Sequence, residues 1–314
     1  YVNPTGGCEW ILVPTVKLSA VQLLQRLKTD AILQVKLAGD DFPKGFVTGS
    51  TMRNSATVKG LIYESQKVDK FEDRVEIKTI LRDSHNNCYE HILKGSPAEN
   101  VLETYVIFIN ESSKKQTLEM LSSFSLSNLS PFNSQNKTGN LMITRYRSKW
   151  SFEGRKEKRP IEEYQLEPSW KPSGVGLEKF GQIGSMPVRN YFPTAAITDV
   201  AENVTWAVRL AHPGSWQGEF YRLDEDLCFS GGLADRDYGQ WTKTLDPGES
   251  YVTPSAFLTT SIGSEEDCGN QFNDYFSKLV SSNKHESEES MAVMFNEFCT
   301  TWGKPSEKSV TEAF

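Results

Sequence analysis

Apolar and charged residues alternate along the stretch Asp73-Arg74-Val75-Glu76-Ile77-Lys78-Thr79-Ile80-Leu81-Arg82-Asp83. Every second residue from Val75 to Leu81 is apolar or β-branched, while charged residues such as Glu76 and Lys78 occupy the alternate positions. Successive side chains of a strand point to opposite faces, so this alternation predicts a β-strand with one face on a core.

Similar segments recur along most of the chain, separated by turn-forming residues such as Asn86-Asn87 and Asp246-Pro247-Gly248. Many short strands with little helix are typical of a large antiparallel β-sandwich. The other predicted strands are Ile32–Leu37, Gly60–Val68, Leu102–Asn110, Thr117–Leu126, Thr144–Phe152, Val204–Leu210, Glu219–Leu223 and Ser250–Thr260.

Two segments have the apolar spacing of a helix that packs on a core, Leu18–Lys28 and Asn270–Asn283. The polar stretch Lys284–Ser290 that follows is interpreted as a surface connection and a domain boundary. On the second helix the predicted core-facing residues are Phe272, Phe276, Leu279 and Val280.

The last residues predict a second fold element. The mostly apolar run Ala292–Cys299 indicates a buried strand, and Thr300–Pro305 a turn. Ser306 is a plausible N-cap for a helix over Glu307–Phe314. A strand, loop and helix cannot bury both faces by themselves, so we expect the start of a truncated second domain.

These patterns divide the chain into three parts: a β-rich domain over residues 1–269, a linking helix and connection over 270–290, and the beginning of an α/β domain over 291–314.

Composition excludes several classes of function. Hydrophobic residues make up 38% of the 314 residues, as in a globular protein, and a net charge of −7 argues against general nucleic-acid binding. No apolar run is long enough to span a membrane. The cysteines form no metal-ligand spacing with the four histidines, so no metal site is predicted and free, mostly buried thiols in a reduced compartment are expected. They are Cys8, Cys88, Cys228, Cys268 and Cys299.

Two polar clusters have both a functional and a structural interpretation. The acids, arginine and asparagine within Gly39–Pro43 and Gly49–Asn54 could hold sugar hydroxyls through charge-assisted hydrogen bonds, or simply fix a turn. The glycine-rich stretch Ser230–Asp237 lacks the lysine of a phosphate-binding loop, which favours a tight turn between strands.

Other candidates favour structural roles. Trp206, Trp216 and Trp241 could stack on sugar rings, but tryptophans on strands are more often core residues. The basic stretch Arg145–Arg159 has period two, which a solvated strand face explains. His212 has no nucleophile partner and is interpreted as structural. No paired carboxylates, nucleophile elbow or dinucleotide motif is found, so the residues alone predict no reaction.

A set of short motifs nevertheless occurs in an order that resembles glycoside hydrolase family 36, the α-galactosidase family. The first are Val35–Asp41, Thr51–Asn54, Leu121–Leu126 and Trp150–Arg155, and the later ones are Tyr191-Phe192-Pro193, Gly214-Ser215-Trp216, Ser230–Asp237 and Phe295–Trp302.

The resemblance implies a fold and an activity. Family members have an N-terminal β-supersandwich, a linking helix and a (β/α)₈ barrel, so this chain would be the supersandwich, that helix and the first strand of a truncated barrel. They release terminal α-linked galactose with retention, using two barrel carboxylates as nucleophile and acid/base. Both would lie beyond this chain, which is therefore expected to contain no catalytic residue and to be inactive by itself.

The resemblance also implies binding residues. Asp41 and Arg53 match an Asp and an Arg that reach the pocket of a neighbouring subunit in tetrameric members and contact the leaving-group sugar. At the end of the first barrel strand the family pattern is Asn–x–Trp, with the Trp lining the galactose pocket, whereas this chain has Asn296-Glu297-Phe298. Phe298 and Trp302 are therefore the candidates for that pocket wall.

The expected substrate is thus an α-galactoside oligosaccharide, and the expected partner is a second copy of the chain in a homo-oligomer, a tetramer when full length. No cofactor, nucleic acid or membrane is expected, and the expected location is the bacterial cytoplasm. Two alternatives stay open: an α-N-acetylgalactosaminidase of the same family, and a stand-alone carbohydrate-binding or interaction module.

Overall fold

The structure, a computed structural model, describes most of the chain as two compact units, Tyr1–Asn273 and Asp274–Phe314. The three-part division at residues 269 and 290 stays a prediction. The described residues are 2–20, 30–43, 49–132, 137–168, 175–186, 189–223, 226–283, 285–288, 291, 293–294 and 296–313.

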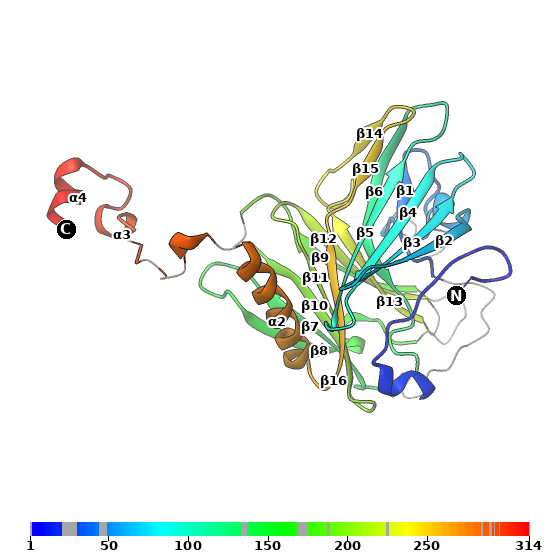
Figure 1. Ribbon diagram of the computed structural model, residues 1–314, viewed down its shortest axis with the longest axis horizontal. Helices are drawn as coiled ribbons and strands as arrows, with labels where there is room; N and C mark the ends of the chain where they lie inside the picture. Colours follow the sequence, from blue (N-terminus) through cyan, green and yellow to red (C-terminus); the bar gives the residue numbers. More distant parts are fainter. Residues whose placement is uncertain are drawn as a thin grey trace. The chain divides into compact units, whose positions relative to one another are not determined.

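The first unit consists almost entirely of antiparallel strands in two sheets, which confirms the predicted mostly β, antiparallel fold (Figure 1). The smaller sheet has the order β1-β6-β13-β12-β9, with β14 paired to β6. Its strands are β1 (Val35–Leu37), β6 (Gln116–Leu126), β9 (Val175–Gln182), β12 (Trp216–Leu223), β13 (Asp226–Leu233) and β14 (Lys243–Leu245).

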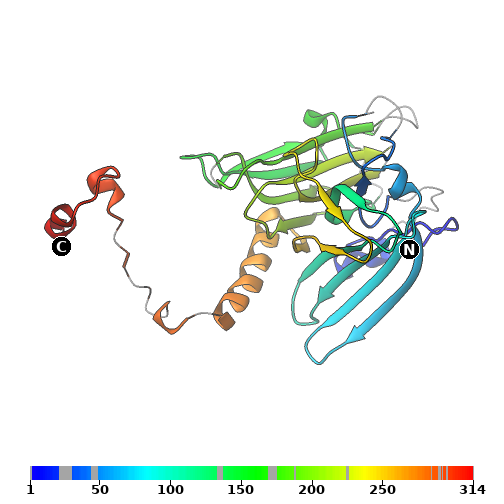
Figure 2. The ribbon, with the colours of Figure 1, turned by 90° about the horizontal axis from the view of Figure 1, so that it is seen from above.

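The larger sheet has the order β2-β3-β4-β5-β16-β11-β10-β7-β8, with β15 paired to β5. Figure 2 shows the cyan strands β2–β4 and the green strands β7 and β8 at opposite ends of this sheet. Its strands are β2 (Ile62–Lys70), β3 (Val75–Arg82), β4 (Cys88–Gly95), β5 (Val101–Ile109), β7 (Leu141–Arg147), β8 (Arg155–Pro160), β10 (Tyr191–Asp199), β11 (Val204–Leu210), β15 (Ser250–Val252) and β16 (Ala256–Ile262).

The turn between β3 and β4 shows how the sequence sets a hairpin. Asn86 adopts a left-handed conformation with φ of 65°, which asparagine tolerates better than most residues. The carboxylate of Asp83 accepts hydrogen bonds from the backbone amides of His85 and Asn87, at 2.8 and 2.9 Å. The predicted turn at Asn86-Asn87 is therefore confirmed, and the strand that follows is in register with β3.

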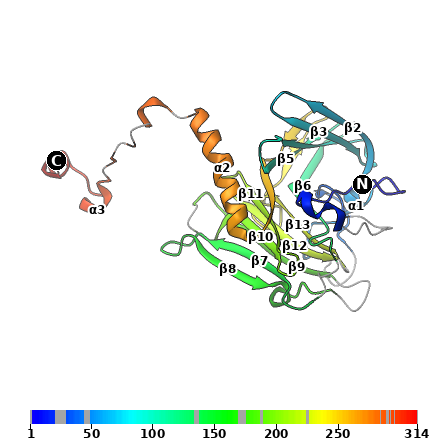
Figure 3. The same cartoon turned by 60° about the horizontal axis from the view of Figure 1, so that its bottom comes forward.

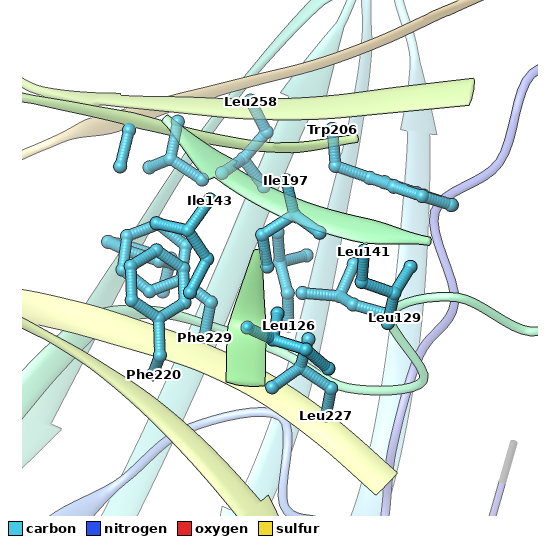
Figure 4. Close-up of a cluster of buried hydrophobic side chains, with 14 of the residues drawn as sticks. Leu126, Leu129, Leu141, Ile143, Ile197, Trp206, Phe220, Leu227, Phe229 and Leu258 are labelled. Atoms are coloured by element: carbon cyan, nitrogen blue, oxygen red, sulfur yellow. The ribbon is translucent and has the colours of Figure 1, made fainter. Parts of the chain in front are cut away.

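The main core lies between the two sheets (Figure 4). Phe220 and Phe229 from the smaller sheet stack with ring centroids 4.2 Å apart, and Ile143 and Ile197 from the larger sheet belong to the same buried cluster. Trp206 is also part of it, and its indole N–H donates to the carbonyl of Leu12 at 2.5 Å. Inward-facing residues of both sheets thus make one apolar layer, as in other sandwiches.

A second core cluster lies farther along the sheets. Val35, Leu118 and Leu121 of the smaller sheet pack with residues of the larger one, including Leu81 and Phe108. The chain therefore needs two clusters to bury its long sheets.

The helices differ in part from the predictions. The structure has a 3-10 helix η1 over Thr15–Ala20, and the rest of the predicted helix Leu18–Lys28 lies outside the described residues. The predicted Asn270–Asn283 helix is confirmed as α2 (Glu265–Asn283). Phe272 is buried as expected, whereas Leu279 and Val280 are exposed, so their predicted core positions are wrong. The remaining helices are α1 (Ala56–Lys59), η2 (Ile161–Tyr164), η3 (Glu286–Glu288), α3 (Phe298–Thr301) and α4 (Glu307–Ala313).

The predicted strand Ala292–Cys299 does not form in the residues described there. Cys299 lies in the short helix α3, and Val293 and Met294 are at least 90% exposed. The described part of residues 291–313 offers no neighbouring strand, and a strand without a hydrogen-bonded neighbour leaves its backbone groups unpaired. The helix after it is confirmed as α4, and Ser306 accepts a hydrogen bond from the amide of Ser309 at 3.1 Å, as an N-cap does.

Candidate functional site

The predicted site begins on the loop that leaves β1. Its two neighbouring acids have different surroundings. The carboxylate of Asp40 accepts hydrogen bonds from the amide of Leu37 at 3.0 Å and from the hydroxyl of Thr57 at 2.9 Å. Asp41 is exposed, while its carbonyl accepts a hydrogen bond from the amide of Ala56 at 3.3 Å. Asp40 therefore fixes the loop, and Asp41 presents a carboxylate to its surroundings.

Arg53 is placed differently, because its side chain is 2% exposed. Its guanidinium lies 2.7 Å from the carboxylate of Asp30, donates to the hydroxyl of Ser230 and stacks over the ring of Tyr221 at 4.9 Å. Burial alone would lower the pKa of Arg53, but the charge of Asp30 outweighs it and raises the pKa above its ordinary value. Arg53 is thus a buried cation with a fixed partner, and the structure does not bring it to the surface beside Asp41.

The loop that carries Arg53 is also tied to the smaller sheet by a glutamate. Thr51 donates to Glu219 of β12 at 2.5 Å, and Lys179 of β9 lies 3.6 Å from Glu219 and 2.7 Å from Asp235. Burial raises the pKa of Glu219 despite the nearby Lys179 and Arg53. Burial would lower the pKa of Lys179, but its two acids raise it.

A third ionic group contacts the loop that carries Asp41. Lys36 of β1 pairs with Glu119 of β6 at 3.0 Å, and Arg236 pairs with the same carboxylate at 2.6 Å. The ammonium of Lys36 also donates to the carbonyl of Asp40 at 3.0 Å and lies 4.5 Å from the ring centre of Phe42. Charged residues on the outer face of the smaller sheet therefore position the loop. We call this group, Asp30, Lys36, Thr51, Arg53, Glu119, Lys179, Glu219, Ser230, Asp235 and Arg236, the polar face.

The glycine-rich stretch belongs to this face. Ser230 to Leu233 forms the end of β13, so the interpretation of the whole stretch as a turn is wrong for its first half. A side chain at Gly231 would lie 2.7 Å from the carbonyl oxygen of Gln217, and one at Gly232 would lie 2.8 Å from the amide of Ser123. The glycines are needed for close strand contact, and no phosphate site is indicated.

The remaining candidates have structural positions. Trp206 and Trp216 are buried core residues, which confirms the expected core role for these two. Trp241 is only partly buried and packs on Tyr251 at the edge of the second cluster, with ring centroids 5.6 Å apart. His212 is partly buried, and burial lowers its pKa.

Arg145 corrects the expectation of a solvated basic strand. It is 3% exposed and pairs with Glu157 of β8 and, at 2.7 Å, with Glu178 of β9, which belongs to the other sheet. Tyr191 covers its guanidinium at 4.8 Å. Alternation of basic and apolar residues in the sequence cannot distinguish a buried ion pair between two sheets from a strand face exposed to solvent.

The two candidate pocket rings lie in the second unit. Phe298 begins α3 and Trp302 follows its end with φ of 54°. The rings contact each other edge to face, 6.0 Å between centroids, and both are more than half exposed. The structure therefore brings these two together, but it does not test whether they line a sugar pocket.

Two kinds of site were sought in the described part of the chain, a metal-binding cluster and a helix that could span a membrane. Its His, Cys, Asp and Glu residues form no group that could hold a metal ion. None of its helices is both long and apolar enough to cross a membrane. All five cysteines are free thiols, four of them buried, as the sequence predicted.

No protein-family model and no curated protein matches this sequence. Solved structures do match. The α-galactosidase from Lactobacillus brevis has a TM-score of 0.58 at 14% identity, over 82% of this chain and 32% of its own. A variant of the GH36 α-galactosidase AgaA from Geobacillus stearothermophilus, in complex with stachyose, has a TM-score of 0.55 at 14% identity, over 76% and 31%.

The galactosidase domain of the α-galactosidase-sucrose kinase AgaSK gives a TM-score of 0.53 at 15% identity, over 71% of this chain and 31% of that one. This chain spans about a third of the length of each of these three structures. The likeness confirms the resemblance at the level of fold: the chain has the fold of the N-terminal β-sandwich region of glycoside hydrolase family 36 α-galactosidases.

Proposed function

We propose that this chain is the N-terminal part of an α-galactosidase-type glycoside hydrolase that releases terminal α-linked galactose from oligosaccharides. The likeness of most of the chain to GH36 α-galactosidases carries the proposal. One of the matched structures is a complex with stachyose and another a complex with raffinose, both of them galactose-containing oligosaccharides.

The chemistry itself is assigned to residues outside this sequence. Retention requires a carboxylate nucleophile and an acid/base roughly 5 Å apart, and the motif resemblance places both on later barrel strands. We therefore propose that residues 291–314 begin a barrel domain and that this chain alone is inactive.

Asp41 is the proposed contact to the leaving-group sugar, made across an interface with a second copy of the chain in a tetramer. Its carboxylate is exposed on a loop that Asp40 and Lys36 fix from inside. A carboxylate held in this way can accept hydrogen bonds from sugar hydroxyls without first ordering its loop.

Arg53 contributes to the same site as a positioning residue. Its motif match suggests a substrate contact, but its buried ion pair with Asp30 leaves it inside the polar face. From there it holds the segment Gly49–Asn54 against the smaller sheet.

Phe298 and Trp302 are the proposed aromatic wall of the galactose pocket, supported by their exposed, touching rings. Phe298 stands where the family pattern has Trp, which favours a second candidate, an α-N-acetylgalactosaminidase with a differently shaped pocket. The five free thiols are consistent with a reducing compartment such as the bacterial cytoplasm.

Hydrolysis of an aryl α-galactoside tests the proposal, comparing this chain with the full-length product of its gene. We expect activity only in the full-length protein. Activity in this chain alone would contradict the placement of the carboxylates. If neither hydrolyses the galactoside but the full-length protein hydrolyses the aryl α-N-acetylgalactosaminide, the second candidate replaces the first.

A further inference from the structure

The larger sheet carries a cavity of about 500 Å³ on its outer face, away from the polar face. The first turns of α2 lie along β10 and β11 there (Figures 1 and 3). Ala196 and Ala207, which are directly paired across these strands, form its floor. Their small side chains leave a hollow between sheet and helix that larger residues would fill.

Aromatic rings and hydrogen-bonding groups converge on this hollow. Tyr146, Phe192 and Phe272 supply three rings, and Arg209 and Glu265 supply a planar donor and a planar acceptor. The size and the mixed lining are those of a small-molecule site.

Both charged groups that line the cavity, Glu265 and Arg209, already have partners within the protein, which suits a neutral ligand. Glu265 lies 2.8 Å from Lys158 and 3.1 Å from Lys156, so its charge is matched within the protein. Arg209 lies over the ring of Phe272 at 5.0 Å, where the ring face stabilises its cation.

A glycine in the covering helix indicates that the space is kept open. Gly269 lies inside α2 and lines the cavity, and a side chain there would meet no atom within 4 Å. Glycine weakens a helix relative to alanine, so the helix gives up stability to keep this wall small.

We propose that this cavity is a carbohydrate-binding site, separate from the Asp41 loop, that takes one or two pyranose rings of a neutral saccharide. The C–H face of a pyranose suits the aromatic walls, and its hydroxyls can donate to Glu265 and accept from Arg209. The site does not depend on the proposed hydrolysis, because it requires binding alone.

Saturation-transfer NMR with this chain tests the site. The probes are methyl α-galactopyranoside and raffinose at millimolar concentration, and benzyl alcohol serves as an aromatic ring without the sugar hydroxyls.

Two variants fill the cavity: Gly269→Phe from the helix and Ala207→Leu from the sheet. Asn270→Phe is the matched control, because it adds the same ring one residue later at an exposed position that does not line the cavity. Circular dichroism verifies that each variant is folded.

We expect the wild type and Asn270→Phe to bind the saccharides, and both filling variants to lose at least tenfold in affinity. The proposal is overturned if the wild type binds neither saccharide, or binds only benzyl alcohol. It is also overturned if the folded filling variants bind as the wild type does, or if Asn270→Phe loses as much affinity as they do. Because hydrolysis is not measured, failure here leaves the proposed function standing, and the reverse also holds.

Discussion

The outer faces of the two sheets are built in opposite ways. On the smaller sheet, the polar face fills the space with buried ion pairs such as Arg53–Asp30, and these hold a loop. On the larger sheet, the space under α2 is left open by Ala196, Ala207 and Gly269. The same antiparallel scaffold thus uses one face to fix a segment and the other to keep a hollow.

The contrast indicates where each face can carry function. Buried charges need well-placed partners, so a network of them fixes geometry more than it adds stability. The polar face is therefore suited to hold Asp41 in place, while the hollow is suited to receive a ligand. Substitutions on the two faces should have different consequences.

Removing the guanidinium from the polar face should have the largest effect. Arg53→Leu leaves the carboxylate of Asp30 buried without its cation, which we expect to cost about 3–5 kcal/mol of the free energy of unfolding. Urea unfolding measures it. The double variant Arg53→Leu with Asp30→Leu removes both charges and should recover much of the loss; equal midpoints for single and double variants would contradict a fixed ion pair.

Replacing Glu265, which lines the hollow, should cost less of the free energy of unfolding. Its pKa is lowered, because its hydrogen bonds to Lys158 and Lys156 outweigh the effect of burial. A lowered carboxyl pKa contributes stability above the unfolded-state pKa of about 4.3 that is lost as pH falls. Glu265→Gln should therefore cost about 1–2 kcal/mol of the free energy of unfolding at pH 7, a modest amount because both lysines are partly exposed. In acid the cost should be small, because the carboxylate of the wild type is then protonated as well. Unfolding at several pH values measures this, and a cost that persists in acid would contradict the assignment.

Glu219, on the polar face, should show the opposite pH dependence. Burial raises its pKa, so the folded state retains a proton that the unfolded state releases, and stability is lost as pH rises through the raised pKa. Relative to the wild type, Glu219→Gln should become more favourable from acid to neutral pH. The same series of unfolding curves reports it, with Glu265→Gln as the contrast of opposite sign. If the stability of both variants, relative to the wild type, changed with pH in the same direction, the predicted difference between the two faces would be contradicted.

The smallest effect is expected at the wall of the hollow. Gly269→Ala adds a methyl group into open space within a helix, which should stabilise the protein by roughly 0.5–1 kcal/mol. A thermal melt measures this gain. A loss of stability would show that the space beside Gly269 is not open.

The sheets were predictable because their alternation is strong. Segments such as β3 and β11 have one apolar face, and a period of two indicates a strand without knowledge of its partners. Strand β7 ends before Trp150 and Phe152, although the pattern predicted its continuation, because Ser151 and Gly154 adopt positive φ and turn the chain. The strand predicted over residues 292–299 failed for a different reason: apolar content alone cannot supply the neighbouring strand that pairing needs.

The site was only partly predictable. The motif resemblance identified Asp41 and Arg53, but twelve residues of spacing cannot show that one side chain is exposed and the other buried against Asp30. The hollow was missed because its floor and walls come from strands and a helix far apart in sequence. A glycine inside an otherwise regular helix, Gly269, was the one local signal.

The polar face is proposed to fix the Asp41 loop so that the carboxylate of Asp41 contacts the leaving-group sugar of the substrate. The most direct test is the kcat/KM of Asp41→Asn in the full-length protein for raffinose, whose leaving group is a sugar, and for an aryl α-galactoside, whose leaving group is not. We predict a loss of about tenfold for raffinose, the size of one charge-assisted hydrogen bond, and no change for the aryl galactoside. Equal losses on both substrates, or none on either, would contradict the claim.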